Sequence, residues 1–195
     1  MNFLAHIYLS GNNEQIQIGN FIGDYVKGNK YLDYPELIQK GILLHRDIDN
    51  FTDNNSLHKL AKRNISKKYK KYSGIIIDIF YDHFLAANWT DYSNIPLPEY
   101  TNTFYKLLKS NYDILPNKVQ DFLPKLISNN RLLSYKDITG IKLALNKMTE
   151  YTSLPKYTNY AISELLKNYS DFNKNFELFM IEIINYLTEK YKLLD

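Results

Sequence analysis

Apolar residues recur along most of this chain at spacings of three and four, which place them on one face of a helix. No segment keeps the apolar–polar alternation that is typical of a half-buried strand, and no internal repeat or low-complexity linker divides the sequence. The pattern therefore predicts an all-α protein, organised as one helical-bundle domain over residues 1–195.

Glycines, prolines and capping residues divide this pattern into separate helices. In the first half, we expect helices at 2–9, from Asn12 to about Val26, at 35–53, at 56–71 and at 74–90. Asn12 with Gln15 forms a capping box for the second of these, and Asp33 is placed to cap the third. In the second half, we expect helices near 99–112, from Pro116 to Ser128 with a kink or break at Pro124, at 137–151, near 157–167 and at 171–193.

The helix over 35–53 becomes polar in its last turns, where the sequence reads GILLHRDIDNFTD (41–53). His45 and Asp49 are four residues apart, so their side chains share one face. An imidazole and a carboxylate placed in this way can reach one metal ion or one phosphate. The same spacing also occurs at ordinary exposed helix ends, so the motif alone leaves both interpretations open.

The most apolar predicted helix, 74–90, contains two aspartates in one stripe, Asp78 and Asp82. A helix with apolar residues on every face is expected to be buried on all sides. Two buried carboxylates repel each other and lose their hydration, so they need a cationic partner. A metal ion, Arg46 or Lys27 would serve, and ion pairs that stabilise the core are the alternative to a metal site.

Polar residues interrupt two further apolar segments. Asn20 and Asp24 are four residues apart on the second helix, and His6 lies within the N-terminal one, where a single histidine is more often a core residue than a ligand. Taken together, carboxylates and a histidine on several apolar helices indicate a divalent-cation site inside a helical bundle. Oxygen-rich ligands favour Mn²⁺, Mg²⁺ or Fe²⁺ over structural zinc.

Composition narrows the class of protein. With 45% hydrophobic and 23% charged residues, the chain is typical of a soluble globular protein, and the lack of cysteine suits a reducing cytoplasm. The short apolar N-terminus is unlike a signal peptide, and no run of 18 apolar residues predicts a membrane span. The net charge of +3 is too small to indicate nucleic-acid binding by itself.

Four segments resemble the signatures of the bacterial acyl carrier protein phosphodiesterases, relatives of the HD-domain metal-dependent phosphohydrolases. They are NFLAHIYLS (2–10), GNFIGDYVKG (19–28), GILLHRDIDNFTD (41–53) and IDIFYDHFLAANW (77–89). The segments occur in the family's order and extend over almost half of the chain. The resemblance implies a distorted HD-like fold and a manganese-dependent hydrolysis that releases 4′-phosphopantetheine from the serine of holo acyl carrier protein.

The resemblance also implies roles for particular residues. We expect four residues to surround the metal ion: His45, Asp49, Asp78 and Asp82. By position, Asp24 corresponds to the family's catalytic aspartate, and it would orient or deprotonate water or add a metal ligand. Arg46 would neutralise charge on the phosphoryl oxygens. His6 or His83 would protonate the leaving serine.

Two positions depart from the family's pattern. Gly23 stands where alanine is usual, which we expect only to loosen the helix. Asp47 stands where a basic residue is often seen, so a substrate contact from this position is not carried over.

The segment KLAKRNISKKYKK (59–71) predicts a helix with a basic outer face. Its basic residues are Lys59, Lys62, Arg63, Lys67, Lys68, Lys70 and Lys71. Such a face is often merely solvated, but it also suits docking of holo acyl carrier protein, which is strongly acidic. The rest of the chain is near-neutral and has no base-reading motif, so we expect no nucleic-acid partner. The alternatives are an HD-type phosphohydrolase that acts on nucleotides and a non-catalytic helical binding module.

Overall fold

A computed structural model describes residues 1–192, and every regular element in this part of the chain is helical. The α-helices are α1 (Phe3–Tyr8), α2 (Glu14–Ile22), α3 (Glu36–Asn54), α4 (Ser56–Tyr69), α5 (Ser73–Ala87), α6 (Leu97–Ser110), α7 (Asn117–Ser128), α8 (Arg131–Ser134), α9 (Ile138–Tyr151), α10 (Thr158–Lys167) and α11 (Tyr169–Tyr191). Short 3₁₀ segments connect them: η1 (Gly23–Tyr25), η2 (Gly28–Asp33), η3 (Lys70–Tyr72), η4 (Trp89–Asp91) and η5 (Tyr112–Ile114). The predicted all-α class is confirmed, and the likeness to HD domains stays a prediction.

The predicted helices are all present, but several of their ends differ. Asn13 caps α2, because its side-chain oxygen accepts the N–H groups of Gln15 and Ile16, both at 3.1 Å, so the predicted cap at Asn12 is wrong by one residue. No side chain caps α3, which begins after Pro35, so the cap expected from Asp33 is wrong as well. α7 continues through Pro124 to Ser128. The predicted end of the last helix at Leu193 lies outside the described residues.

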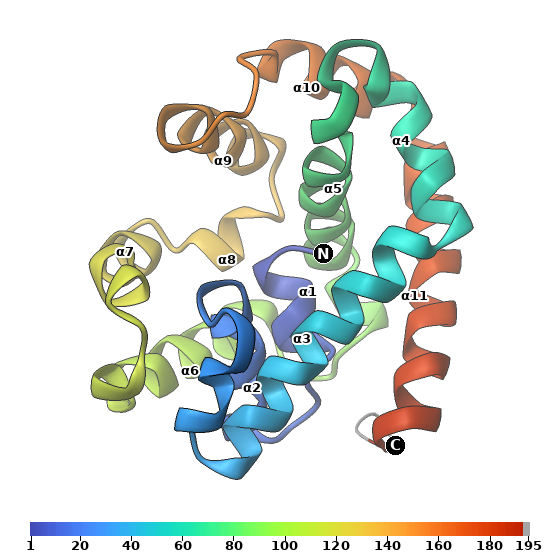
Figure 1. The fold of residues 1–195 in the computed structure, drawn as a ribbon. Coiled ribbons are helices and arrows are strands. Elements are labelled where there is room, and N and C mark those ends of the chain that lie inside the picture. The colour runs from blue at the N-terminus through green and yellow to red at the C-terminus, as the bar shows by residue number, and fades with distance from the viewer. Residues whose placement is uncertain (193–195) are drawn as a thin grey trace.

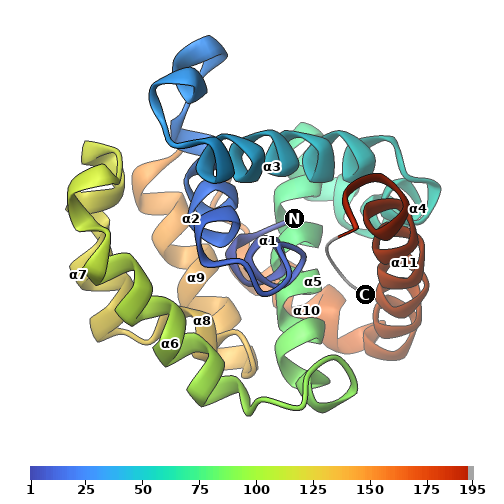
Figure 2. The same ribbon diagram turned by 90° about the horizontal axis from the view of Figure 1, so that it is seen from below.

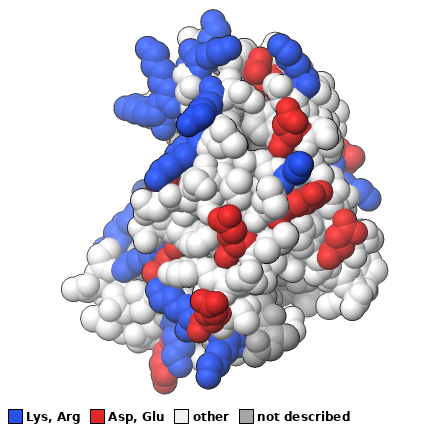
Figure 3. Space-filling model, turned by 90° about the vertical axis from the view of Figure 1, so that its right-hand side faces the viewer, with Lys and Arg blue, Asp and Glu red and all other residues white. Residues whose placement is uncertain are grey.

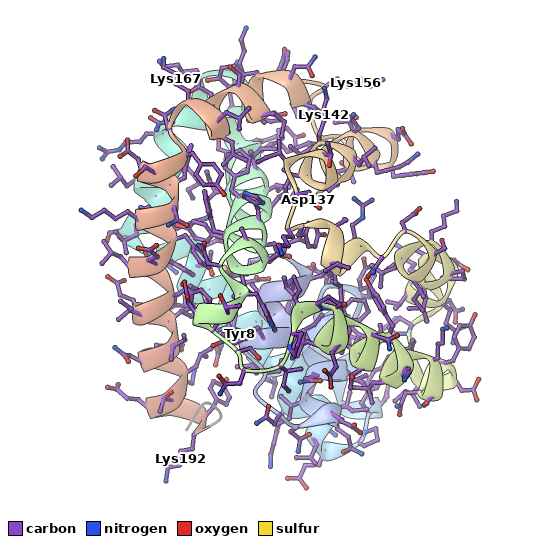
Figure 4. All side chains as sticks on the ribbon, turned by 180° about the vertical axis from the view of Figure 1, so that it is seen from behind. Tyr8, Asp137, Lys142, Lys156, Lys167 and Lys192 are labelled. Atoms are coloured by element: carbon purple, nitrogen blue, oxygen red, sulfur yellow. The ribbon has the colours of Figure 1, made fainter. Side chains whose placement is uncertain are left out.

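The central helix is α5, which packs against α1, α4, α9 and α11. Figure 1 shows it in the middle of the molecule, with α4 and α11 on one side and α9 on the other. From Ile79 to Ala86 its side chains are buried on all faces, as its apolar sequence predicts, while Ile75 near its start is exposed. From behind, Tyr8 of α1 lies next to the segment that follows α5, where its ring contacts Trp89 and its hydroxyl donates to the carbonyl of Tyr92 (Figure 4).

Helices α2 and α3 cross with their backbones in contact at two glycines. A Cβ atom on Gly19 would lie 2.2 Å from the carbonyl oxygen of Ile38, and one on Gly41 would lie 2.3 Å from that of Ile16. Only glycine therefore permits this approach. The crossing brings Asn20, on α2, against the part of α3 that carries His45.

The C-terminal helix is attached to α3 by a polar contact. Lys190 and Tyr191, at the end of α11, both donate hydrogen bonds to the carboxylate of Asp47. Figure 2, seen from below, shows α11 next to the end of α3 that leads into α4. Asp47 therefore has a structural partner within the chain. Among residues 1–192, no helix has the length and apolar character needed to span a membrane.

Candidate metal centre

Two histidines and one aspartate converge from helices α1 and α3. Nε2 of His6 lies 3.2 Å from Oδ1 of Asp49, and Nε2 of His45 lies 3.2 Å from Oδ2 of the same carboxylate. One ligand atom from each of the three residues lies within 4.8 Å of the others. Both histidines are buried and Asp49 is partly exposed, so the group is open to solvent on the side of its carboxylate.

Asn20 determines which nitrogen of each ring faces this group. Its side-chain N–H₂ donates to the carbonyl of His6 and to Oγ of Ser10, both at 2.8 Å, which leaves Oδ1 as an acceptor. Nδ1 of His6 donates to this oxygen at 2.7 Å, and Nδ1 of His45 donates to the backbone carbonyl of Asn20 at 2.8 Å. Each Nδ1 therefore carries the ring proton when the ring is neutral, and each Nε2 presents a lone pair towards Asp49.

Burial and charge give the two rings opposite tendencies to bind a proton. Burial, together with the charge of neighbouring His45, lowers the pKa of His6 to about 4. Burial alone would lower the pKa of His45 too, but hydrogen bonds that the imidazole donates to the carboxylates of Asp24 and Asp49 outweigh it and raise that pKa to about 9. Burial opposes the charge of Asp49, but the two histidines hold the pKa of that carboxyl well below its usual range.

Asp24 lies at the edge of this group, on η1. Its Oδ1 is 3.6 Å from Nε2 of His45, and its side chain is 63% exposed, so it can contact an incoming molecule as well as the imidazole. Its hydrogen bond with His45 lowers the pKa of the Asp24 carboxyl, which favours the carboxylate form.

The close packing of His45 against the backbone requires a glycine at position 23, just before Asp24. A Cβ atom on Gly23 would lie 2.3 Å from Cγ of His45, closer than two carbon atoms can approach. The expectation that glycine here only loosens the helix is therefore wrong. Glycine leaves space for the imidazole ring.

The donor set fits a divalent metal ion. In the described part of the chain, Nε2 of His6 and Nε2 of His45 are both buried, and neither faces any polar group except the carboxylates of Asp49 and, for His45, Asp24. Two buried imidazole nitrogens that converge on one carboxylate form the ligand arrangement of a metal site. The hydrogen bonds of both Nδ1 atoms to Asn20 are of the kind that orients histidine rings at metal sites.

The two aspartates of α5 contact other groups. The oxygens of Asp82 accept the backbone N–H groups of Leu4 and Ala5, at 2.9 and 3.0 Å, and so cap the start of α1. Oδ1 of Asp78 lies 3.1 Å from Nε2 of His58 and 3.3 Å from the amino group of Met1, which itself lies 3.8 Å from Asp49. Neither aspartate joins the His6–His45–Asp49 group, because each is already held by groups that belong to the core.

Two further expected site residues also have partners of their own. His83 bonds through Nδ1 to the carbonyl of Tyr135 and through Nε2 to the hydroxyl of Tyr169, at 2.8 and 3.0 Å. Arg46 donates from Nη2 to the carbonyls of Val26 and Gly28, at 3.0 and 2.7 Å, and so holds the turn between η1 and η2.

The basic residues expected on the fourth helix lie on α4 and η3. All are exposed except Lys62, which is half-buried, and none of them forms a salt bridge with residues 1–192. Figure 3 shows Lys and Arg side chains gathered at the upper end of the face formed by α4 and α11. We call the seven residues Lys59, Lys62, Arg63, Lys67, Lys68, Lys70 and Lys71 the basic ridge.

Comparison with known proteins identifies the family. The family model described as acyl carrier protein phosphodiesterase matches residues 1–183. The chain belongs to this family. A protein of that name from Escherichia coli O6:H1 is 34% identical over 152 residues, which cover 76% of this chain and 77% of the relative. Those from Yersinia pestis and Photorhabdus laumondii are 33% and 29% identical, covering 76% and 90% of this chain and 77% and 89% of the relatives. No solved structure matches the chain.

The sequence of this acyl carrier protein phosphodiesterase family member gives no role to two residues near the metal centre. It shows Asn20 only as one half of a polar pair with Asp24, and it does not single out His58. A signal for His58 is present, because it precedes Ala61 and Ile65 on the apolar face of α4, which predicts burial. Nothing near Asn20 in the sequence indicates that it hydrogen-bonds both His6 and His45, because these two residues lie on other helices.

Proposed function

We propose that this protein hydrolyses the phosphodiester that joins 4′-phosphopantetheine to a serine of holo acyl carrier protein. The products are apo acyl carrier protein and 4′-phosphopantetheine. The observation that supports this most directly is the pair of buried Nε2 atoms that converge on the carboxylate of Asp49, in a chain of the acyl carrier protein phosphodiesterase family.

We assign the metal ligands to His6, His45 and Asp49, in place of the set that includes Asp78 and Asp82. A mixture of imidazole nitrogen and carboxylate oxygen suits Mn²⁺, with Mg²⁺ and Fe²⁺ as alternatives. When bound, such an ion polarises the phosphoryl oxygens and lowers the pKa of water towards neutrality. In this assignment His6 is a ligand and not the acid that protonates the serine, and His83 supports the fold.

The remaining steps belong to side chains at the open edge of the site. Asp24, charged and exposed, accepts a proton from the attacking water. Arg46 holds the turn that follows Asp24 through its bonds to Val26 and Gly28, and its positive charge near Asp24 would stabilise negative charge on the phosphoryl oxygens. Asn20 keeps both imidazole rings in the orientation that metal binding requires.

We also propose that the basic ridge receives the carrier protein, and that the reaction takes place in the cytoplasm. His58, in the first turn of α4, contacts Asp78, and the amino group of Met1 lies between Asp78 and Asp49. The ridge therefore begins close to the metal centre. An acidic protein docked there would present its modified serine towards Asp49.

The test of the proposed function is direct. The protein is stripped of metal with a chelator, reconstituted with Mn²⁺, Mg²⁺ or Fe²⁺, and incubated with holo acyl carrier protein or with a panel of nucleotides. We expect the mass of the carrier protein to fall by that of phosphopantetheine with Mn²⁺ and not in the chelated sample. Hydrolysis of a nucleotide with none of the holo carrier protein would favour the alternative HD-type activity. Loss of neither substrate with any ion would favour the non-catalytic module.

A further inference from the structure

A cavity of about 470 Å³ lies between the η1–η2 turn and the segment that joins η5 to α7. This volume is within the range of about 300–1,000 Å³ that is typical of sites for small organic ligands. One wall includes Tyr25, Val26 and Tyr34, and the opposite wall includes Ile114, Leu115 and Asn117. The proposed mechanism uses none of the residues on the second wall.

The cavity is continuous in sequence with the metal centre. Tyr25 and Val26 directly follow Asp24, and Arg46 donates to the carbonyl of Val26. Pro35, which also lines the cavity, immediately precedes α3. His45 lies ten residues further along the chain, about 15 Å at the rise of an α-helix.

The cavity and the basic ridge lie at opposite ends of α3. Figure 2 shows the turn that contains η2 at one end of this helix and α4 at the other. The scissile phosphodiester has a protein on one side and the pantetheine arm on the other. With the carrier protein on the basic ridge and the phosphate at His45 and Asp49, the arm extends along α3 towards the cavity.

The lining suits this arm better than it suits a nucleotide. Tyr25, Tyr34 and Ile114 offer apolar surface for the methylene and dimethyl groups, and Asn117 offers an amide to the amides of the arm. The charged lining residues are Lys30, Asp33 and Asp113. Two carboxylates against one ammonium repel a polyphosphate but are compatible with an arm that is uncharged beyond its phosphate.

We infer that this cavity binds the pantetheine arm of holo acyl carrier protein, with the terminal thiol at the wall formed by Ile114 and Asn117. The inference rests on the proposed function, because it names how the substrate of that site is held. The test does not depend on hydrolysis, so the assignment of the cavity and the proposed function can be overturned independently of each other.

The chain contains no cysteine, so one introduced thiol is unique. Asn117→Cys is treated with pantethine, the disulfide of pantetheine. The cysteine thiolate attacks one sulfur, forms a mixed disulfide and releases one pantetheine thiol. Asn129→Cys, an exposed position at the other end of α7, is the matched control, and hydroxyethyl disulfide reports the intrinsic reactivity of each thiol. Ile114→Cys is a second variant on the same wall.

We expect the ratio of the rates with pantethine and hydroxyethyl disulfide to be about tenfold higher for Asn117→Cys and Ile114→Cys than for Asn129→Cys, since about 1.4 kcal/mol of binding gives this factor. Added 4′-phosphopantetheine should slow the labelling of the two cavity variants only. Equal ratios at all three positions would overturn the assignment of the cavity, even if the unmodified protein hydrolyses holo carrier protein. Selective labelling in a protein that lacks this hydrolysis would support the cavity and overturn the proposed function.

Discussion

The imidazole rings of His6 and His45 are stacked, with centroids 4.1 Å apart and an angle of 19° between their planes. The rings come from α1 and α3, and Asn20 of α2 binds both of them. Two buried rings at this distance do not both carry a charge, which is why burial and the neighbouring ring keep the pKa of His6 at about 4 while that of His45 is raised to about 9. The pair therefore carries one positive charge near neutral pH, held on His45, and in the proposed function a metal ion would take the place of that extra proton.

The first prediction concerns Asn20. Asn20→Ala removes the acceptor that orients His6, and we expect Mn²⁺ affinity to fall about 10–100-fold, the usual effect of losing a group that hydrogen-bonds a metal-binding histidine. Isothermal titration with Mn²⁺ measures the change. Asn50→Ala, an exposed amide next to Asp49 on α3, is the control and should bind Mn²⁺ as the unmodified protein does. A folded Asn20→Ala protein with unchanged affinity would show that the rings are oriented by other contacts.

The second prediction concerns pH. Because the pKa of His45 is raised to about 9, the ring is protonated at neutral pH, and this proton must leave before a metal ion binds. Mn²⁺ affinity should therefore rise about tenfold per pH unit up to a pH of about 9 and level off above it. Asp24→Asn removes a carboxylate that raises this pKa, so levelling should begin at lower pH. Affinity independent of pH in the unmodified protein would rule out His45 as a ligand.

The third prediction concerns the space beside His45. Gly23→Ala places a methyl group against the ring, and we expect a loss of about 1–3 kcal/mol of unfolding free energy, with weaker Mn²⁺ binding. Gly74→Ala is the control, since its Cβ would meet no atom closer than 3.7 Å and the change should leave the protein as stable or more stable. Urea denaturation compares the two variants. If Gly23→Ala is as stable and binds Mn²⁺ as tightly as the unmodified protein, the close packing is not required.

The fourth prediction separates Asp82 from the metal ligands. Burial raises the pKa of Asp82 to about 7, against the effect of the N–H groups of Leu4 and Ala5. Between the ordinary carboxyl pKa of about 4 and this value, the folded protein holds a proton that the unfolded chain has lost, so stability falls as the pH rises. The unfolding free energy of the unmodified protein, relative to Asp82→Asn, should decrease across this window.

The control for Asp82 is Asp53→Asn, which replaces an exposed carboxylate on α3. The difference between Asp53→Asn and the unmodified protein should not show this decrease. If the unfolding free energy of Asp82→Asn differs from that of the unmodified protein by the same amount at every pH, Asp82 does not titrate in this range.

The fifth prediction concerns the basic ridge. Reversal of Lys67, Lys68, Lys70 and Lys71 to Glu should raise KM for holo carrier protein and leave hydrolysis of a small phosphodiester unaltered. The same number of reversals on α6–α9 is the control: Lys106, Lys125, Lys136 and Lys142, the last of which lies on the face seen in Figure 4. KM of the unmodified protein should rise with salt as the Debye length falls from about 30 to about 8 Å. An equal rise in KM in both variants would indicate net charge instead of docking.

Features set by local geometry were predictable from the sequence. The four-residue spacing of His45 and Asp49 predicts a shared face on any helix, and the structure has both on α3. The buried character of α5 was likewise readable, because hydrophobic periodicity depends on neighbours along the chain.

The partners of the polar side chains depended on how the helices pack. Asp78 and Asp82 have the spacing of a ligand pair, yet Asp82 meets the start of α1 and Asp78 meets His58. His6 is an isolated histidine in the sequence and meets His45 and Asp49 because α1 packs on α2, which in turn crosses α3 at Gly19 and Gly41. A sequence determines which polar groups need a hydrogen-bond or ionic partner when they are buried. The partners themselves come from residues far apart in the chain, and they meet only once the helices have packed.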